Sequence, residues 1–205
     1  IEPILSRNSI PNDFKYLALI ESGLQNVVSP AGAAGYWQIM KSTGRENGLE
    51  INNEIDERYH IEKSTQVACD YLNEAYERFG NWTLAAASYN MGVAGTARRL
   101  SEQGVKSYYD LLLNSETARY VYRIAAVKHI HENLEEFGYV YHQDQGYSFP
   151  EMDTISVNTT VADWISWAKT QEITYNTLRI YNPWIQSQQL SNSTNKAYHI
   201  WVPSK

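Results

Sequence analysis

Glu21 is the acidic residue best placed to do chemistry, because it falls on the apolar side of a short predicted helix. Pro11 suits the first turn of that helix and Gly23 suits its end. Residues three and four apart share a helix face, so Glu21 lies over Leu17 and Ala18. Apolar surroundings raise the pKa of a carboxyl group and let it donate a proton near neutral pH. We therefore expect Glu21 to be able to protonate a leaving oxygen. A structural alternative stays open, in which its carboxylate faces water or caps a backbone N–H at the helix end.

A second candidate is the block Tyr36-Trp37-Gln38, which follows a loop of small residues from 26 to 35. Such a loop lets the backbone approach a ligand closely. The two aromatic rings could stack on a sugar while the amide binds its hydroxyl or acetamido group. The alternative is a short helix that packs Trp37, Ile39 and Met40 into the core.

Tyr89 and Asn90 lie near the end of an alanine-rich helix predicted between Asn81 and Gly92. The alanines allow another helix to pack closely, and the break after Asn90 leaves both side chains where a cleft could form. Taken alone, Asn90 is more often a helix C-cap than a ligand-binding residue, because asparagine tolerates the left-handed conformation there.

Other reactive residue types give weaker signals. We interpret Glu57 and Glu62 as helix-dipole or salt-bridge residues, because acids are common in first turns. Cys69 is the only cysteine and reads as a small buried thiol. His129 and His131 are two apart and diverge on a helix, so no metal site and no cofactor is predicted.

Helical patterns dominate the chain up to about residue 140. One helix is predicted from Ile61 to Phe79, and the longest from Ser115 to about Phe137. The buried stripe of the longest helix is predicted to consist of Tyr120, Ile124, Val127, His131 and Leu134. Residues 1–10 show little pattern and are expected to form a lead-in segment.

The amino-acid composition changes near residues 141–150, after which Ser, Thr, Asn and Gln are frequent and apolar residues are isolated. Residues 154–157 and 198–202 are predicted strands, with helical patches at 161–169 and 174–181 between them. We therefore expect a mainly α protein with two domains, a helical one at 1–145 and a small β-α-α-β (α+β) module at 146–205.

Composition limits the function classes. The 205 residues carry a net charge of -6, which argues against nucleic-acid binding. There are 16 Tyr and 6 Trp but only 4 Phe, so most rings carry a polar group, as suits hydroxylated ligands. No apolar run is long enough to cross a bilayer, so this portion is expected to be soluble. Ile1 indicates processing or truncation, and any signal or outer-membrane anchor would lie outside this chain.

Four blocks in order resemble the lysozyme-like domain of lytic transglycosylases: Glu21-Ser22, Gly35-Tyr36-Trp37-Gln38, Ser88-Tyr89-Asn90, and Glu116-Thr117 with Tyr120-Val121. The resemblance implies that Glu21 is the catalytic acid and base. It implies substrate-binding or positioning roles for Ser22, Tyr36, Trp37, Gln38, Tyr89, Asn90 and Tyr120. Tyr36-Trp37 stands where many relatives have Leu-Met, which bears on subsite preference.

The C-terminal module is similar, more faintly, to a LysM peptidoglycan-binding module. Residues 157–160 stand where that module usually has a Gly-Asp-Thr turn, and Asn182-Pro183 follows its second helix. Loss of the usual glycine and aspartate leaves two roles open, glycan binding and service as a spacer or docking unit.

The resemblance implies a monomeric enzyme of the periplasm or outer membrane that acts on peptidoglycan glycan strands. It would cleave the MurNAc–GlcNAc bond and leave 1,6-anhydro ends. Two alternatives remain: a hydrolytic muramidase that uses a second acid such as Glu57 or Glu62, and a non-catalytic wall-binding protein.

Overall fold

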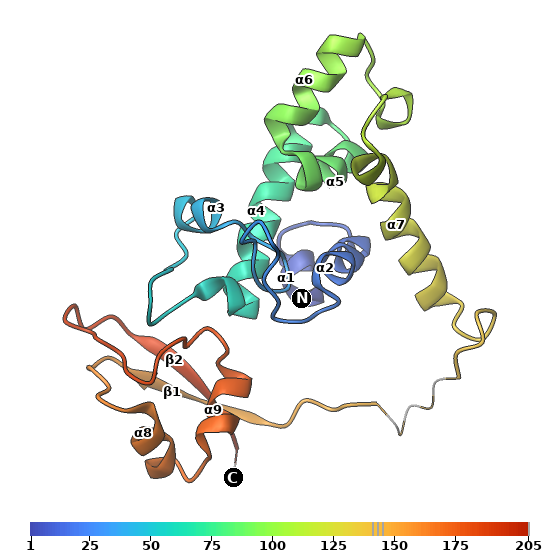
Figure 1. Ribbon diagram of the computed structural model, residues 1–205. Coiled ribbons are helices and arrows are strands. Elements are labelled where there is room, and N and C mark those ends of the chain that lie inside the picture. The colour runs from blue at the N-terminus through green and yellow to red at the C-terminus, as the bar shows by residue number, and fades with distance from the viewer. Residues whose placement is uncertain (141, 143, 145, 205) are drawn as a thin grey trace.

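The computed structural model describes residues 1–140, 142, 144 and 146–204. The chain is mainly helical and ends in a small unit with two strands (Figure 1). The α-helices up to residue 140 are α1 (Glu2–Arg7), α2 (Lys15–Ser22), α3 (Lys41–Glu46), α4 (Ile61–Phe79), α5 (Trp82–Met91), α6 (Val93–Gln103) and α7 (Ser115–Glu132). Short 3-10 helices are η1 (Asn12–Phe14), η2 (Glu57–Tyr59) and η3 (Tyr108–Asp110). The end unit contains β1 (Met152–Val157), α8 (Trp164–Thr170), α9 (Tyr175–Tyr181) and β2 (Tyr198–Pro203).

The predicted helix that carries Glu21 is confirmed as η1 followed by α2. Gly23 ends α2 in the left-handed conformation, with φ of 63°, and its N–H bonds the Leu19 carbonyl. Leu17 and Ala18 are fully buried, so the inner face of α2 is apolar as the spacing predicts. Glu21 therefore stands in the last turn of a helix that is fixed by its own core contacts.

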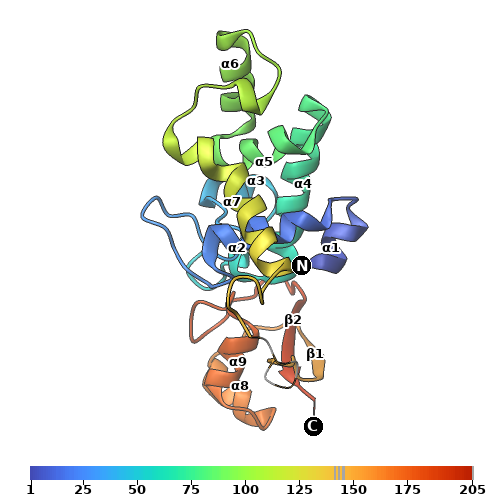
Figure 2. The same ribbon diagram turned by 90° about the vertical axis from the view of Figure 1, so that its right-hand side faces the viewer.

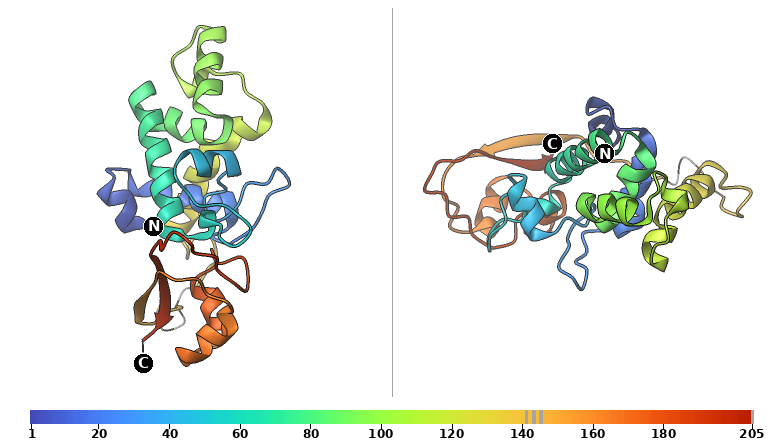
Figure 3. Two further views of the ribbon diagram at one scale, coloured as in Figure 1. Left: turned by 90° about the vertical axis from the view of Figure 1, so that its left-hand side faces the viewer. Right: turned by 90° about the horizontal axis from the view of Figure 1, so that it is seen from above.

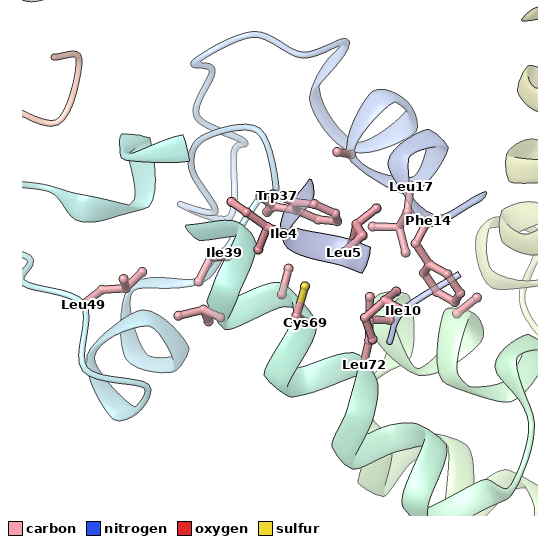
Figure 4. Packing of buried hydrophobic residues seen from close by; sticks show 14 of the residues in the cluster. Ile4, Leu5, Ile10, Phe14, Leu17, Trp37, Ile39, Leu49, Cys69 and Leu72 are labelled. Carbon is pink, nitrogen blue, oxygen red and sulfur yellow. The ribbon is translucent and has the colours of Figure 1, made fainter. Parts of the chain in front are cut away.

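One hydrophobic core joins α1, α2 and α4 with the segment after α2 (Figure 4). Trp37 lies in this core with no exposed surface, and its Nε1 donates to Thr65 Oγ1 at 2.8 Å. Cys69 is also buried there, as predicted. The core thus anchors the loop between α2 and α3 through an aromatic side chain.

Helices α4 and α5 begin and end where the sequence predicts. Gly80 ends α4 with φ of 71°, and Asn81 caps α5 by accepting from Leu84 N at 2.9 Å. The alanines of α5 at 85, 86 and 87 are buried, and α5 packs against both α4 and α7. These close contacts bring the end of α5 to the site.

Helix α7 is shorter and more exposed than the sequence predicts. It ends at Glu132 rather than near Phe137. Of the predicted stripe only Tyr120 is buried, while Ile124, Val127 and Leu134 are half-buried and His131 is exposed. The reason is that α7 packs on α2 and α5 along one side, so its second half lies at the surface.

Two further expectations were wrong. Residues 1–10 are not an irregular lead-in, because α1 forms there and buries Ile4 and Leu5. A six-residue helix is too short to show a periodic pattern. No helix forms over Tyr36–Met40 either, because Gln38 adopts a positive φ of 47° and a bridge joins Ala34 to Ile39.

The predicted β-α-α-β order of the end unit is confirmed. Strands β1 and β2 pair antiparallel, with Met152 opposite Pro203 and Val157 opposite Tyr198. Helices α8 and α9 cover the pair and bury Trp164 and Leu178. This unit lies at the end of the molecule opposite α6 (Figures 2 and 3).

The end unit packs directly on the helical part. Ile55, just before η2, is fully buried in the hydrophobic core of the end unit and forms a bridge with Ile185. Asp56 N donates to Trp184 O at 2.9 Å, and Gln186 N donates to Glu54 O at 2.7 Å. Among the described residues, no helix is long and apolar enough to cross a membrane.

Candidate active site

Helix α7 runs antiparallel along α2, and this pairing builds the site. Lys128 pairs with Asp13 at 2.7 Å at one end of the contact, and Arg123 Nη2 donates to Ile20 O at 3.2 Å near the other. The register places the Tyr120 hydroxyl on Glu21, where it donates a short hydrogen bond to Oε1. Glu21 is thus held by a buried phenol on the neighbouring helix.

The Glu21 carboxyl is half-buried, and its pKa is raised because burial disfavours the charged form. The hydrogen bond from Tyr120 and the positive charge of Arg123 oppose that rise, while the negative charge of Glu116 adds to it. Burial outweighs the opposing effects. The carboxyl therefore holds its proton at higher pH than an exposed glutamate, which suits a proton donor.

Asn90 links α5 to the start of α7. Its Nδ2 donates to Glu116 Oε1 at 3.3 Å, and its Oδ1 accepts from Thr117 Oγ1 at 2.8 Å. It lies inside α5, which continues to Met91, so it is not a C-cap. Both ends of the amide are engaged, and the side chain fixes Glu116 near Glu21.

Tyr89 lies between the core and a cavity of about 230 Å³. Its hydroxyl donates to Trp37 O at 2.8 Å, and its ring meets the ring of Tyr71 edge-on at 5.5 Å. Burial, together with the nearby charge of Glu21, raises the pKa of Tyr89 well above its ordinary value. Gln38 and Met40 line the same cavity.

The loop between α2 and α3 is held by backbone contacts rather than by a regular element. Ser22 Oγ donates to Tyr36 O at 2.9 Å, and Gln38 Nε2 donates to Gly35 O at 2.8 Å and to Val27 O at 3.1 Å. These bonds fix the two side chains in positions that orient the loop beside Glu21.

The structure brings together most of the predicted site residues. Glu21, Tyr120, Tyr89 and Asn90 lie where α2, α5 and α7 meet, with Ser22 beside Glu21. Gln38 lines the same cavity as Tyr89. Tyr36 is half-buried and faces a different cavity, described below. The prediction that Trp37 stacks on a sugar is wrong, because its ring is fully buried. The alternative, in which Trp37 packs into the core, holds for this residue.

Sequence reasoning missed Arg123 and gave Glu116 no role. Both act on the Glu21 carboxyl through their charges. The available signal was spacing, because residues three and four away from Tyr120 share its face of the helix.

Glu57 and Glu62 are not placed to act as a second catalytic acid beside Glu21. Glu57 is buried, accepts from Glu50 N at 2.7 Å and pairs with Lys63, so both carboxylate oxygens are engaged. Its interpretation as a salt-bridge residue is confirmed. Glu62 is exposed in the first turn of α4.

A mainly helical domain with one half-buried acid, followed by a β-α-α-β unit, defines a lysozyme-like class of protein with an appended LysM-like unit. Residues 2–112 match the Transglycosylase SLT domain family, and residues 153–205 match the soluble lytic transglycosylase C-terminal LysM-like domain. The chain belongs to the Transglycosylase SLT domain family. Both resemblances noted in the sequence are confirmed.

Two curated proteins are similar to part of the chain. Membrane-bound lytic murein transglycosylase D of Escherichia coli K12 is 29% identical over 140 residues, which is 65% of this chain and 31% of that protein. A putative tributyltin chloride resistance protein of Alteromonas is 26% identical over 99 residues, covering 47% of this chain and 48% of that protein. The chain therefore spans about a third to a half of these relatives.

The fold has a solved counterpart. The 70 kDa soluble lytic transglycosylase SLT70 of Escherichia coli matches with a TM-score of 0.53 at 24% identity, covering 65% of this chain and 24% of that one. The lysozyme-like fold class is confirmed by this match.

Proposed function

We propose that this chain is a peptidoglycan lytic transglycosylase that cleaves the β-1,4 bond between MurNAc and GlcNAc without water and leaves a 1,6-anhydro end. The observation that carries the proposal is one half-buried carboxyl, Glu21, with a raised pKa and a fixed phenol donor. Membership of the transglycosylase family supports the substrate class.

In the first step Glu21 gives its proton to the glycosidic oxygen, and the bond between that oxygen and C1 of MurNAc breaks. The GlcNAc side leaves as an alcohol, and positive charge develops at C1. The substrate's own acetamido group stabilises that charge. Tyr120 donates its hydrogen bond to the Glu21 carboxylate that forms, so this donor acts most strongly when the negative charge has appeared.

In the second step the Glu21 carboxylate takes the proton of the MurNAc C6 hydroxyl, whose oxygen bonds C1 and closes the anhydro ring. Glu21 ends protonated as it began, and no water is consumed. A well-oriented hydroxyl on the same molecule has an effective concentration of about 10⁵ M or more, so it outcompetes water. The reaction therefore needs only one carboxylate.

The main argument against the first rival, a hydrolytic muramidase, is that neither acid considered for the second role is placed to serve. Ordinary glycosidases need two carboxylates that flank the bond. Glu57 is engaged by Lys63 and Glu62 is exposed, so neither of the two acids first considered serves as the second group.

The second rival is a wall-binding protein without activity. A protein of that kind needs no buried acid, because burial of a carboxyl raises the free energy of its ionised form. The joint placement of Glu21, Tyr120 and Asn90 favours an active enzyme.

We place the protein in the cell envelope, in the periplasm or at the outer membrane, because its substrate is found there. Peptidoglycan glycan strands are its proposed partner. We expect it to act as a monomer.

The test is Glu21→Gln, which keeps the shape of the side chain but removes its proton. Turnover of purified cell walls, followed by loss of turbidity, should fall by at least about 10²- to 10⁴-fold. The raised pKa of Glu21 means that its contribution to stability is present at low pH and is lost as pH rises through that pKa. The neutral variant should therefore be at least as stable as the wild type at pH 7. Unchanged turnover would remove Glu21 from its role.

A further inference from the structure

A cavity of about 320 Å³ lies between the helical part and the end unit. Both parts contribute to its wall, and most of the contributing side chains are aromatic. The helical part contributes Tyr36 and His60, and the end unit and the segment before it contribute Phe149, Tyr181, Trp184 and Trp201. The site exists only when both parts are present.

The rings of this wall contact one another and hold each other in place. His60 stacks on Trp184 with centroids 5.8 Å apart, and Trp201 meets His60 edge-on at 6.2 Å. Phe149 meets Tyr181 at 5.6 Å and Trp201 at 6.3 Å, both edge-on. The wall is therefore preorganised, which lowers the entropic cost of binding.

The lining also contains polar side chains without formal charge, among them Asn26 and Tyr36. Burial lowers the pKa of His60 to about 4, so the ring is neutral at physiological pH. None of the described residues that line the cavity is Asp, Glu, Lys or Arg. Aromatic faces beside neutral polar groups suit a ligand that is half apolar and half hydroxylated.

The cavity is linked to the proposed active site through the loop after α2. Tyr36 lines the cavity, while its carbonyl accepts the hydrogen bond from Ser22, the neighbour of Glu21. The same loop residue therefore contacts both places.

We propose that this cavity is a distal glycan-binding subsite, in which sugars of the strand remote from the cleaved bond pack against Tyr36, Tyr181 and Trp201. The subsite rests on the proposed function, since it takes the same strand that Glu21 cuts. The end unit then helps to bind substrate rather than serving as a spacer. A stem peptide is the less suitable occupant, because its carboxylates and amines would meet no opposite charge in this lining.

The test measures binding in the Glu21→Gln background by calorimetry, with two peptide-free GlcNAc–MurNAc oligosaccharides. One spans only the sugars on either side of the cleaved bond, and the other is about twice as long. The longer one should bind the parent more tightly. Tyr181→Ala should weaken its binding by about 3- to 10-fold and leave the shorter one unchanged.

A second variant changes the same cavity in a different way, and a control variant removes a tyrosine ring elsewhere on the surface. Ile180 is 61% exposed and lines the cavity, so Ile180→Trp should fill the space without unfolding the protein and should give the same loss. Tyr139→Ala, an equal truncation at an exposed tyrosine outside the lining, should change nothing.

The proposal is overturned if neither variant alters binding of the longer oligosaccharide, or if the variants reduce binding of a free stem peptide instead. Failure of the proposed function is a separate result, because it would be seen as wild-type turnover that does not depend on Glu21.

Discussion

The chemistry of Glu21 depends on a balance between burial and two neighbouring side chains. Burial raises its pKa, while the Tyr120 hydroxyl and the Arg123 charge favour the ionised form. Tyr120 remains a donor throughout the working range of pH, because burial and the charge of Glu21 raise its own pKa well above the ordinary value. Burial therefore favours the protonated carboxyl that gives the proton, and Tyr120 and Arg123 stabilise the carboxylate that remains.

Removing the positive charge of Arg123 should shift the pH profile. In Arg123→Gln the pKa of Glu21 rises, because the opposite charge that lowers it is gone. Since the protonated acid is the active form, the basic limb of kcat/KM should move to higher pH. The matched control is Arg119→Gln, an exposed arginine on the same helix. A shift to lower pH, or an equal shift in the control, would contradict this electrostatic account.

Removing the negative charge of Glu116 should act in the opposite direction. Glu116→Gln takes away a like charge that raises the Glu21 pKa, so the basic limb should move to lower pH. The amide can still meet Asn90, which limits structural change. If the limb moves to higher pH in this variant, the assignment of the limb to Glu21 is wrong.

At the scale of elements, the loop between α2 and α3 depends on a buried ion pair. Arg58 pairs with Asp56 at 2.7 Å, and its Nη1 donates to Gly32 O at 2.8 Å and to Ile39 O at 3.2 Å. The backbone of Arg58 lies so close to Gly35 that a Cβ there would stand 2.2 Å from its carbonyl oxygen. These contacts hold the loop that carries Tyr36 and Gln38 against η2.

Gly35→Ala should destabilise this loop strongly. Gly35 has φ of 77°, which costs an alanine about 1–2 kcal/mol, and the clash with Arg58 O adds to that cost. The control is Gly32→Ala, where φ is 87° but nothing lies within 4 Å of the new Cβ. Denaturant unfolding should show a larger loss of stability for the first variant than for the second, and equal losses would exclude the clash.

Local signals explain which elements could be predicted. Gly80, Asn81 and Gly23 act on their own helix ends, so α2, α4 and α5 follow from the sequence. Burial of Trp37 was one of two alternatives that the sequence could not decide between, because its partner Thr65 is 28 residues away. The pairing of Tyr120 with Glu21 spans 99 residues, and only the family resemblance pointed to it.

At the scale of the whole molecule, the two parts share a core. Ile55 of the helical part is fully buried among residues of the end unit. Polar contacts add to this, since Glu50 pairs with Lys196 at 2.5 Å and accepts from the Tyr198 hydroxyl at 3.0 Å. The domain boundary predicted between residues 145 and 146 falls partly outside the described residues and stays a prediction. We expect the two units on either side of it to remain joined in space.

Limited proteolysis tests both the boundary and the contact. Chymotrypsin should cut first near Tyr147, which is fully exposed and lies between the two units. Because Ile55 and Glu50 hold the end unit, the two fragments should elute together in native size exclusion and separate only in denaturant. Fragments that separate without denaturant would show that the contact is too weak to form a shared subsite.

The central claim is that Glu21 cuts the strand with the substrate's own hydroxyl as nucleophile. The most direct test is mass spectrometry of peptidoglycan digested by the wild-type protein. We predict new muramic acid ends that are lighter by one water than ordinary reducing ends, as a 1,6-anhydro ring requires. New ends that carry the full mass of a reducing sugar would mean that water attacks, and would contradict the account.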